Sequence, residues 1–153
     1  RRHSDKEETL RHENDLNEFI VANKLDHRVH FLGYQNNMHP FYASVRMFLH
    51  CARQEPLGRV LLEAAAYGIP VIATNVGGTN EIFKRRDQGI IIDPDAPGQL
   101  AAEISSLIDS PDSARHIGAN GRAAIQDSFD IRKTSVQLAA IYRRTISCAN
   151  RSS

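Results

Sequence analysis

The chain has 153 residues, 41% hydrophobic and 24% charged, which fits one soluble globular domain and leaves little room for a second complete one. Its 19 basic and 18 acidic residues give a formal net charge of +1, which argues against a nucleic-acid partner held by a broad basic face. The two cysteines lack CxxC spacing, and no apolar run approaches the roughly 18 residues of a membrane span. We therefore expect a cytoplasmic protein, with peripheral membrane contact left open.

The first part of the chain predicts a helix, a strand and a short helix. Ser4 followed by Glu7 forms a capping box, and apolar residues then recur on one helical face, so we expect a helix over about residues 5–24. The run RVHFLG, residues 28–33, has the length of a strand and ends at a glycine. The stretch NNMHPFYAS predicts one short helix, with Pro40 in its first turn.

The middle of the chain predicts two strands on either side of a helix. The first strand is VRMFLHC, residues 45–51, and the second is PVIATNVGG, residues 70–78, which is nearly all apolar. A helix over residues 58–68 lies between them and ends at Gly68. We expect its buried face to consist of Val60, Leu61, Ala64 and Ala65.

The remainder predicts a brief helix from about Thr79 to Arg85, a strand in GIIIDP, and three further helices. The first of these follows Asp95, the second opens at Ser110 and Pro111, and the third runs from about Ile131 to Ile146. In the helix after Asp95 we expect Leu100, Ile104, Leu107 and Ile108 to face inward. Strands that alternate with helices at this spacing predict parallel βαβ units of the α/β class, wound right-handed.

Ligands of an open α/β sheet lie beyond the carboxyl ends of the strands, where loops lead into helices. Residues 51–58 form such a loop, which places residues 55–63 at the mouth of any site. The amides of Gly58, Arg59 and Val60 fall in the first helical turn and lack partners within the helix, so they can bind a diphosphate.

Two glutamates stand in this segment with seven residues between them, Glu55 in the loop and Glu63 in the helix. Glu63 can accept hydrogen bonds from the vicinal hydroxyls of a ribose, and Glu55 would reach another part of the same ligand. The alternative is that Glu55 only complements the helix dipole and that Glu63 is an ordinary exposed helix former. The spacing by itself favours that alternative.

Longer motifs favour a ligand-binding role for the two glutamates. The stretch QEPLGRVLLEAAAYGIPVIATNVGGTNEIF, with RVHFLG upstream and GIIIDPDAPGQLAAEI and GANGRAAIQDSFDI downstream, resembles the nucleotide-sugar-binding half of GT-B glycosyltransferases, specifically the family-4 or group 1 retaining enzymes. The resemblance covers nearly the whole chain in order. It implies a Rossmann-like, doubly wound parallel sheet, the C-terminal half of a GT-B fold. Within it, Gly118 and Gly121 look like packing positions.

The resemblance assigns roles to particular residues. Glu55 is similar to the catalytic acid that contacts and orients the donor sugar, and Glu63 to the acid that binds the ribose. The backbone at Leu57 and Gly58 matches the positions that meet the diphosphate, and the turn near Gly33 and Tyr34 matches the base contact. The expected donor-binding residues are Pro56, Leu57, Gly58, Arg59, Val60, Glu63, Gly33 and Tyr34.

The resemblance further implies retaining transfer of a sugar from a nucleotide-diphosphate donor to an acceptor hydroxyl, without a metal or other cofactor. VGG with Glu81 also matches the family, although a plain turn and helix start explains it as well. The family usually has a Pro-Ser-like pair where this chain has His50 and Cys51, so a ligand contact there is in doubt. We expect His50 to be a strand-end histidine with a partner and not a catalyst.

Family members also carry an acceptor-binding domain and two further strands before the region matched. We therefore expect residues 1–153 to be one partial donor-binding domain that lacks its first two strands, binds donors weakly, and is inactive alone. The run at Met47–His50 would then be an exposed sheet edge, so we expect VHFL, or a second copy of the chain, to pair with RMFLH.

Two other functions stay open. One is a non-catalytic α/β interaction module that recruits a partner through the exposed edge. The other is half of a sugar-nucleotide epimerase, which shares the architecture but normally has a different pattern of acids and histidines. The acceptor, including a lipid-linked one, belongs to a domain outside this sequence.

Overall fold

The computed structural model describes residues 3–149, and the fold divides into two compact units, Arg1–Met38 and His39–Ser153. The capping-box side chain of Ser4 lies outside the described side chains, as does that of Cys148. The assignment of residues 1–153 to a single domain stays a prediction.

The first unit consists of α1, His3–Ala22, followed by turns and irregular backbone. The helix confirms the predicted one, but the predicted strand at residues 28–33 is wrong. The amides of Arg28 and Val29 donate to the carbonyl of Leu25 at 2.8 and 3.0 Å, so the run begins in a turn. Its large side chains stay exposed, with Phe31 at 60% and Leu32 at 59%.

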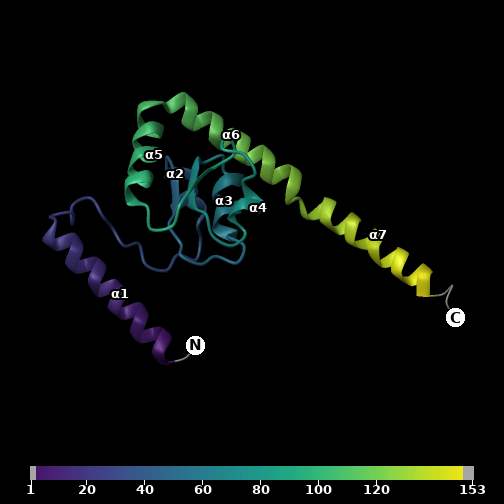
Figure 1. The fold of residues 1–153 in the computed structure, drawn as a ribbon, viewed down its shortest axis with the longest axis horizontal. Coiled ribbons are helices and arrows are strands. Elements are labelled where there is room, and N and C mark those ends of the chain that lie inside the picture. The colour runs from purple at the N-terminus through teal and green to yellow at the C-terminus, as the bar shows by residue number, and fades with distance from the viewer. Residues whose placement is uncertain (1–2, 150–153) are drawn as a thin grey trace. The chain divides into compact units, whose positions relative to one another are not determined.

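The second unit has three strands and six helices within the described residues. In chain order they are α2 His39–Ser44, β1 Phe48–His50, α3 Arg59–Ala66, β2 Val71–Thr74, α4 Thr79–Ile82, β3 Ile90–Ile92, α5 Pro97–Asp109, α6 Pro111–Ser128 and α7 Ile131–Ala149. Every predicted helix and the other three predicted strands are present. In Figure 1 the strands lie in the blue-to-teal part of the ribbon, with α5 and α6 in green around them.

The strands form one parallel sheet in the order β1-β2-β3. Leu49 lies opposite Ile72, and Ala73 lies opposite Ile91. β2 is the central strand and all four of its residues are buried, as expected for a parallel strand covered on both faces. The α/β class and the parallel sheet are confirmed. β1 is an edge strand, and the predicted pairing of VHFL with it within the chain is wrong.

The hydrophobic core joins the sheet to the helices that follow it. Its buried members are Ile72, Ile90, Ile92, Leu107 and Ile117, with Met47, Leu100, Ile104 and Ala114 packed around them. Because α5 contacts β3 while α6 contacts both α5 and β2, the second half of the unit holds the sheet in place.

Two side chains predicted to face inward do not. Val60 is 36% exposed because it lies about 100° around the helix from Leu61, at the edge of the fully buried stripe of Leu61, Ala64 and Ala65. Ile108 is 62% exposed because it follows the buried Leu107 by one position, about 100° around the helix.

Two glycines let α6 approach its neighbours closely. A Cβ atom at Gly118 would lie 2.0 Å from the carbonyl oxygen of Gly68, and one at Gly121 would lie 2.6 Å from that of Gln88. Both are therefore packing positions, as predicted. They seat α6 against the end of α3 and the loop before β3.

The last helix, α7, follows α6 in the chain (Figure 1). Its large apolar side chains are exposed, including Ile131 at 74% and Tyr142 at 60%. Among the described residues there is no helix with both the length and the apolar character needed to cross a bilayer.

Candidate functional site

The candidate site lies where β1 leads into α3. β1 ends at His50, and α3 begins at Arg59 after a loop whose last residue, Gly58, has φ +81°. This backbone conformation is unfavourable for residues with a side chain, and a Cβ here would also meet Leu61 Cδ1 at 2.7 Å. Gly58 thus allows the loop to turn sharply into the helix.

Glu55 folds back onto the start of this helix. Its Oε1 accepts hydrogen bonds from the amides of Gly58 at 2.8 Å and Leu57 at 3.3 Å, while Oε2 lies 3.2 Å from Nε2 of His50. The amide of Gly58 is the main cause that lowers the pKa of Glu55. The amide of Leu57 and the imidazole of His50 add to the effect, and burial opposes it. His50 is thus a partnered strand-end histidine, as expected.

This geometry affects the proposed diphosphate contacts. The amides of Leu57 and Gly58, which the resemblance assigns to the phosphates, donate to the carboxylate of Glu55. A bound diphosphate would replace that carboxylate or bind the next amides of the turn, those of Arg59 and Val60. Either arrangement puts Glu55 beside the ligand.

A turn that contains Gly77 and Gly78 contacts the loop of Glu55. Gly77 has φ +50°, and a Cβ there would lie 1.7 Å from the carbonyl oxygen of Glu55. The amide of Gly78 also donates to that oxygen at 3.4 Å. The VGG motif therefore holds the loop of Glu55 through backbone contact, a role that the sequence did not indicate.

Glu63 lies on α3, outside the core, with 42% of its side chain exposed. Its Oε2 accepts a hydrogen bond from the hydroxyl of Tyr42 at 3.1 Å, and its Oε1 lies 3.6 Å from Nη2 of Arg59. The carboxylate is thus partly accessible in the second turn of the helix, and its contact with a ribose stays a prediction.

Tyr42 was missed by sequence reasoning. It is 4% exposed, and burial together with the hydrogen bond to Glu63 raises its pKa to about 12, so the hydroxyl stays protonated and donates. Its place in the stretch HPFYAS predicted only a short helix, because no spacing rule links that helix to a carboxylate 21 residues later.

The arginines near the site are already paired with carboxylates. Arg53 donates to Oδ1 of Asp95 from Nε at 3.2 Å and Nη2 at 3.1 Å, and Arg59 pairs with Glu63. Both arginines are mostly exposed, so these ion pairs are weak and can be exchanged for a ligand phosphate.

Residues 11–124, more than half of the chain, match the family described as Glycosyl transferases group 1. The chain belongs to the group 1 glycosyltransferases. It is 31% identical over 118 residues to N-acetyl-alpha-D-glucosaminyl L-malate synthase of Bacillus anthracis, covering 77% of this chain and 31% of that protein. It is 30% identical over 135 residues to the lipopolysaccharide core biosynthesis mannosyltransferase LpsB of Rhizobium meliloti, covering 87% of this chain and 38% of that protein.

Solved structures agree with this family. Anabaena Alr3699/HepE in complex with UDP has a TM-score of 0.81, and in complex with UDP-glucose one of 0.79, both at 28% identity. Each comparison covers 86% of this chain and 36% of the Anabaena chain. The chain thus spans about a third of the length of the relatives it matches.

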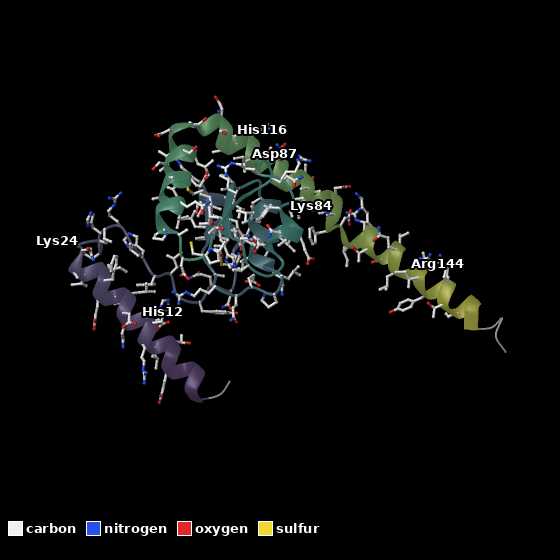
Figure 2. The ribbon with its side chains drawn as sticks, in the orientation of Figure 1. His12, Lys24, Lys84, Asp87, His116 and Arg144 are labelled. Atoms are coloured by element: carbon white, nitrogen blue, oxygen red, sulfur yellow. The ribbon has the colours of Figure 1, made fainter. Side chains whose placement is uncertain are left out.

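Two further features concern the turn at Gly33 and Tyr34 and the basic residues 84–86. Gly33, with φ +63°, and Tyr34, 89% exposed, belong to the first unit, so their contact with a base stays a prediction. In the cationic cluster of residues 84–86, Arg85 pairs with Asp87 and Arg86 with Glu103 (Figure 2, where Lys84 and Asp87 are labelled).

A groove of about 630 Å³ lies at the opposite, amino ends of β1 and β2. Its lining includes Arg46, Ile69, Ile108 and Arg115. Ligands of open parallel sheets bind at the carboxyl ends, so we place the candidate site at α3 and not in this groove. Within the described residues no group of three or more His, Cys, Asp or Glu side chains is arranged to hold a metal ion, and the expectation of a metal-free reaction stays a prediction.

Proposed function

We propose that the second unit binds a nucleotide-diphosphate sugar at the start of α3 and that the whole protein transfers this sugar to an acceptor hydroxyl with retention of configuration. Membership of the group 1 family supports the proposal, and so do the similar Anabaena structures, which are complexes with UDP and UDP-glucose. The observation that carries it is the placement of two partly exposed carboxylates on one helix, Glu55 at its first turn and Glu63 one turn further along.

The proposed role of each residue follows from this placement. Glu63 accepts the hydroxyls of the ribose, and the amides at residues 57–60 meet the diphosphate. Glu55 leaves those amides and orients the donor sugar, with His50 close enough to hold its other oxygen. Fixed dipoles at a helix start favour the charge that builds up on the departing diphosphate, which is the usual electrostatic contribution of an enzyme to such a step.

Donor binding can be tested on this chain directly. We expect the diphosphates of uridine, guanosine and adenosine to bind with millimolar affinity or weaker, because the local arginines are exposed and paired. We also expect one of the three bases to be preferred. Calorimetry and NMR titration of the three compounds measure this. Micromolar affinity would contradict the proposed weakness, and the absence of any shift at residues 55–63 at saturating concentration would overturn the site.

The proposal includes partners that lie beyond this chain. The acceptor would be held by an acceptor-binding domain, and a lipid-linked acceptor would bring the cytoplasmic protein to a membrane surface. A non-catalytic interaction module is the second candidate, favoured by the position of β1 at the sheet edge, where Leu49 is 40% exposed. Concentration-dependent self-association that persists while no nucleotide binds would favour this second function.

A further inference from the structure

The hydroxyl of Tyr42 is a buried polar group that points at one of the two site carboxylates. It donates to Oε2 of Glu63 at 3.1 Å from a residue that is only 4% exposed. A buried hydroxyl without a partner is costly, so this bond is strongly favoured once the ring is in place. The contact links α2 to α3 across 21 residues of sequence.

The ring that carries this hydroxyl is held on several sides by other aromatic rings. Its centroid lies 5.3 Å from that of Tyr67, 5.6 Å from that of Phe41 and 6.0 Å from that of Phe48. Aromatic rings in contact at these distances attract one another and leave little freedom for the ring to move. The hydroxyl is therefore a donor fixed in space.

The carboxylate of Glu63 accepts a hydrogen bond at one oxygen and is accessible to a ligand at the other. A carboxylate offers about four acceptor positions, of which Tyr42 uses one on Oε2. Oε1 faces the exposed guanidinium of Arg59 at 3.6 Å, which is longer than a hydrogen bond, and 42% of the side chain is exposed. The carboxylate is thus oriented from the buried side while its outer positions remain accessible.

Resting on the proposed function, we propose that Tyr42 is a positioning residue for nucleotide binding, whose hydroxyl orients the carboxylate of Glu63 toward the ribose hydroxyls of the donor. Tyr42 does not touch the ligand in this account. Its effect passes through Glu63 and is confined to ligands that carry those hydroxyls.

Tyr67 provides a matched control. It belongs to the same aromatic cluster, and the partner of its hydroxyl is Nδ1 of His39, at 2.8 Å. Tyr67→Phe therefore removes one hydroxyl from the cluster, as Tyr42→Phe does, without changing the partners of Glu63. Both substitutions keep the ring, so the packing of the core is retained.

The test compares uridine diphosphate with 2′,3′-dideoxyuridine diphosphate by NMR titration of the full chain and of both variants. We expect the unmodified chain to prefer uridine diphosphate, and Tyr42→Phe to weaken its binding by about three- to tenfold while leaving the dideoxy compound unchanged. Tyr67→Phe should keep the original preference. A merely structural role of Tyr42 would weaken both compounds equally.

The other outcomes distinguish a failure of the positioning role of Tyr42 from a failure of the proposed function. If the unmodified chain prefers uridine diphosphate and Tyr42→Phe keeps that preference in full, the positioning role is wrong and the proposed function stands. If the unmodified chain does not distinguish the two compounds, or binds neither, the ribose contact of Glu63 fails, and the role of Tyr42 fails with it.

Discussion

Residues 28–33 and residues 71–74 are both short apolar runs, yet only the second forms a strand. In the second run all four residues are buried, from Val71 to Thr74. In the first run Val29, Phe31 and Leu32 are between 41% and 60% exposed. The difference shows that an apolar run of strand length becomes a strand only where neighbouring strands supply hydrogen bonds and covering helices supply burial.

β2 has both conditions, because β1 and β3 pair with its two edges and α3 and α6 contact it. Residues 28–33 follow a turn at Leu25 and pair with no strand among the described residues. Stability should accordingly be concentrated in the second unit, and substitutions in the two runs should differ sharply in effect.

The largest contrast is expected between Ile72→Ala and Leu32→Ala. Ile72 is fully buried, so its truncation should lower the free energy of unfolding by about 2–5 kcal/mol. Leu32 is 59% exposed, so its truncation should change that free energy by no more than about 0.5 kcal/mol. Urea denaturation of both variants measures the difference. Equal effects would mean that residues 28–33 pack in solution as β2 does.

A second contrast uses glycines within the second unit. Gly118→Ala would place a methyl group against the carbonyl of Gly68 and should destabilise the fold by about 1–3 kcal/mol. Gly98→Ala meets nothing within 4 Å in the first turn of α5 and should be neutral or stabilising by up to about 1 kcal/mol. Thermal unfolding distinguishes the two. A neutral Gly118→Ala would show that α6 does not approach α3 so closely.

An effect of intermediate size is expected from the loop of Glu55, as a dependence of stability on pH. Its pKa is lower in the folded chain, so the stability it contributes is present above the ordinary value of 4.5 and is lost as the pH falls through the lower folded value. The melting temperature of Glu55→Gln should therefore fall less steeply with decreasing pH than that of the unmodified chain. Part of the loss should remain, because the pKa values of Asp87 and Asp127 are also lowered, by Arg85 and Lys133. An unchanged acid slope would contradict the hydrogen bonds to Leu57 and Gly58.

The smallest effect is expected at the surface of the second unit. Arg115 pairs with Asp112 one turn earlier in α6, and the two side chains are 73% and 92% exposed. Arg115→Ala should therefore lower the free energy of unfolding by only about 0.2–1 kcal/mol, and less in high salt. A loss as large as that of Ile72→Ala would mean that surface charge, and not burial, stabilises this unit.

Local patterns were sufficient to predict much of the fold. The helix of residues 59–66 carries its own signals, with Gly58 before it and Gly68 after it, and the apolar runs at β2 and β3 are long enough to indicate buried strands. The pair of Glu55 and Glu63 was visible from spacing and motif. These features depend on residues close together in the chain.

The remaining features depend on contacts between distant residues. Nothing in residues 28–33 indicates that the run would lack a partner, and nothing in HPFYAS indicates that Tyr42 would reach Glu63. The contact of Gly77 with the carbonyl of Glu55 likewise arises only when two loops meet. Sequence reasoning located the two acids of the candidate site but not the groups that hold them in position.

The central claim is that the first turn of α3, between Glu55 and Glu63, binds the nucleotide part of a sugar donor. Amide NMR of the full chain titrated with uridine diphosphate tests this most directly, with Glu63→Gln as the companion variant. We expect saturable shifts at residues 55–63, weaker binding in the variant, and smaller changes around β3 and α5. Saturable shifts centred instead on the groove at Arg46 and Arg115, and unaffected by Glu63→Gln, would contradict it.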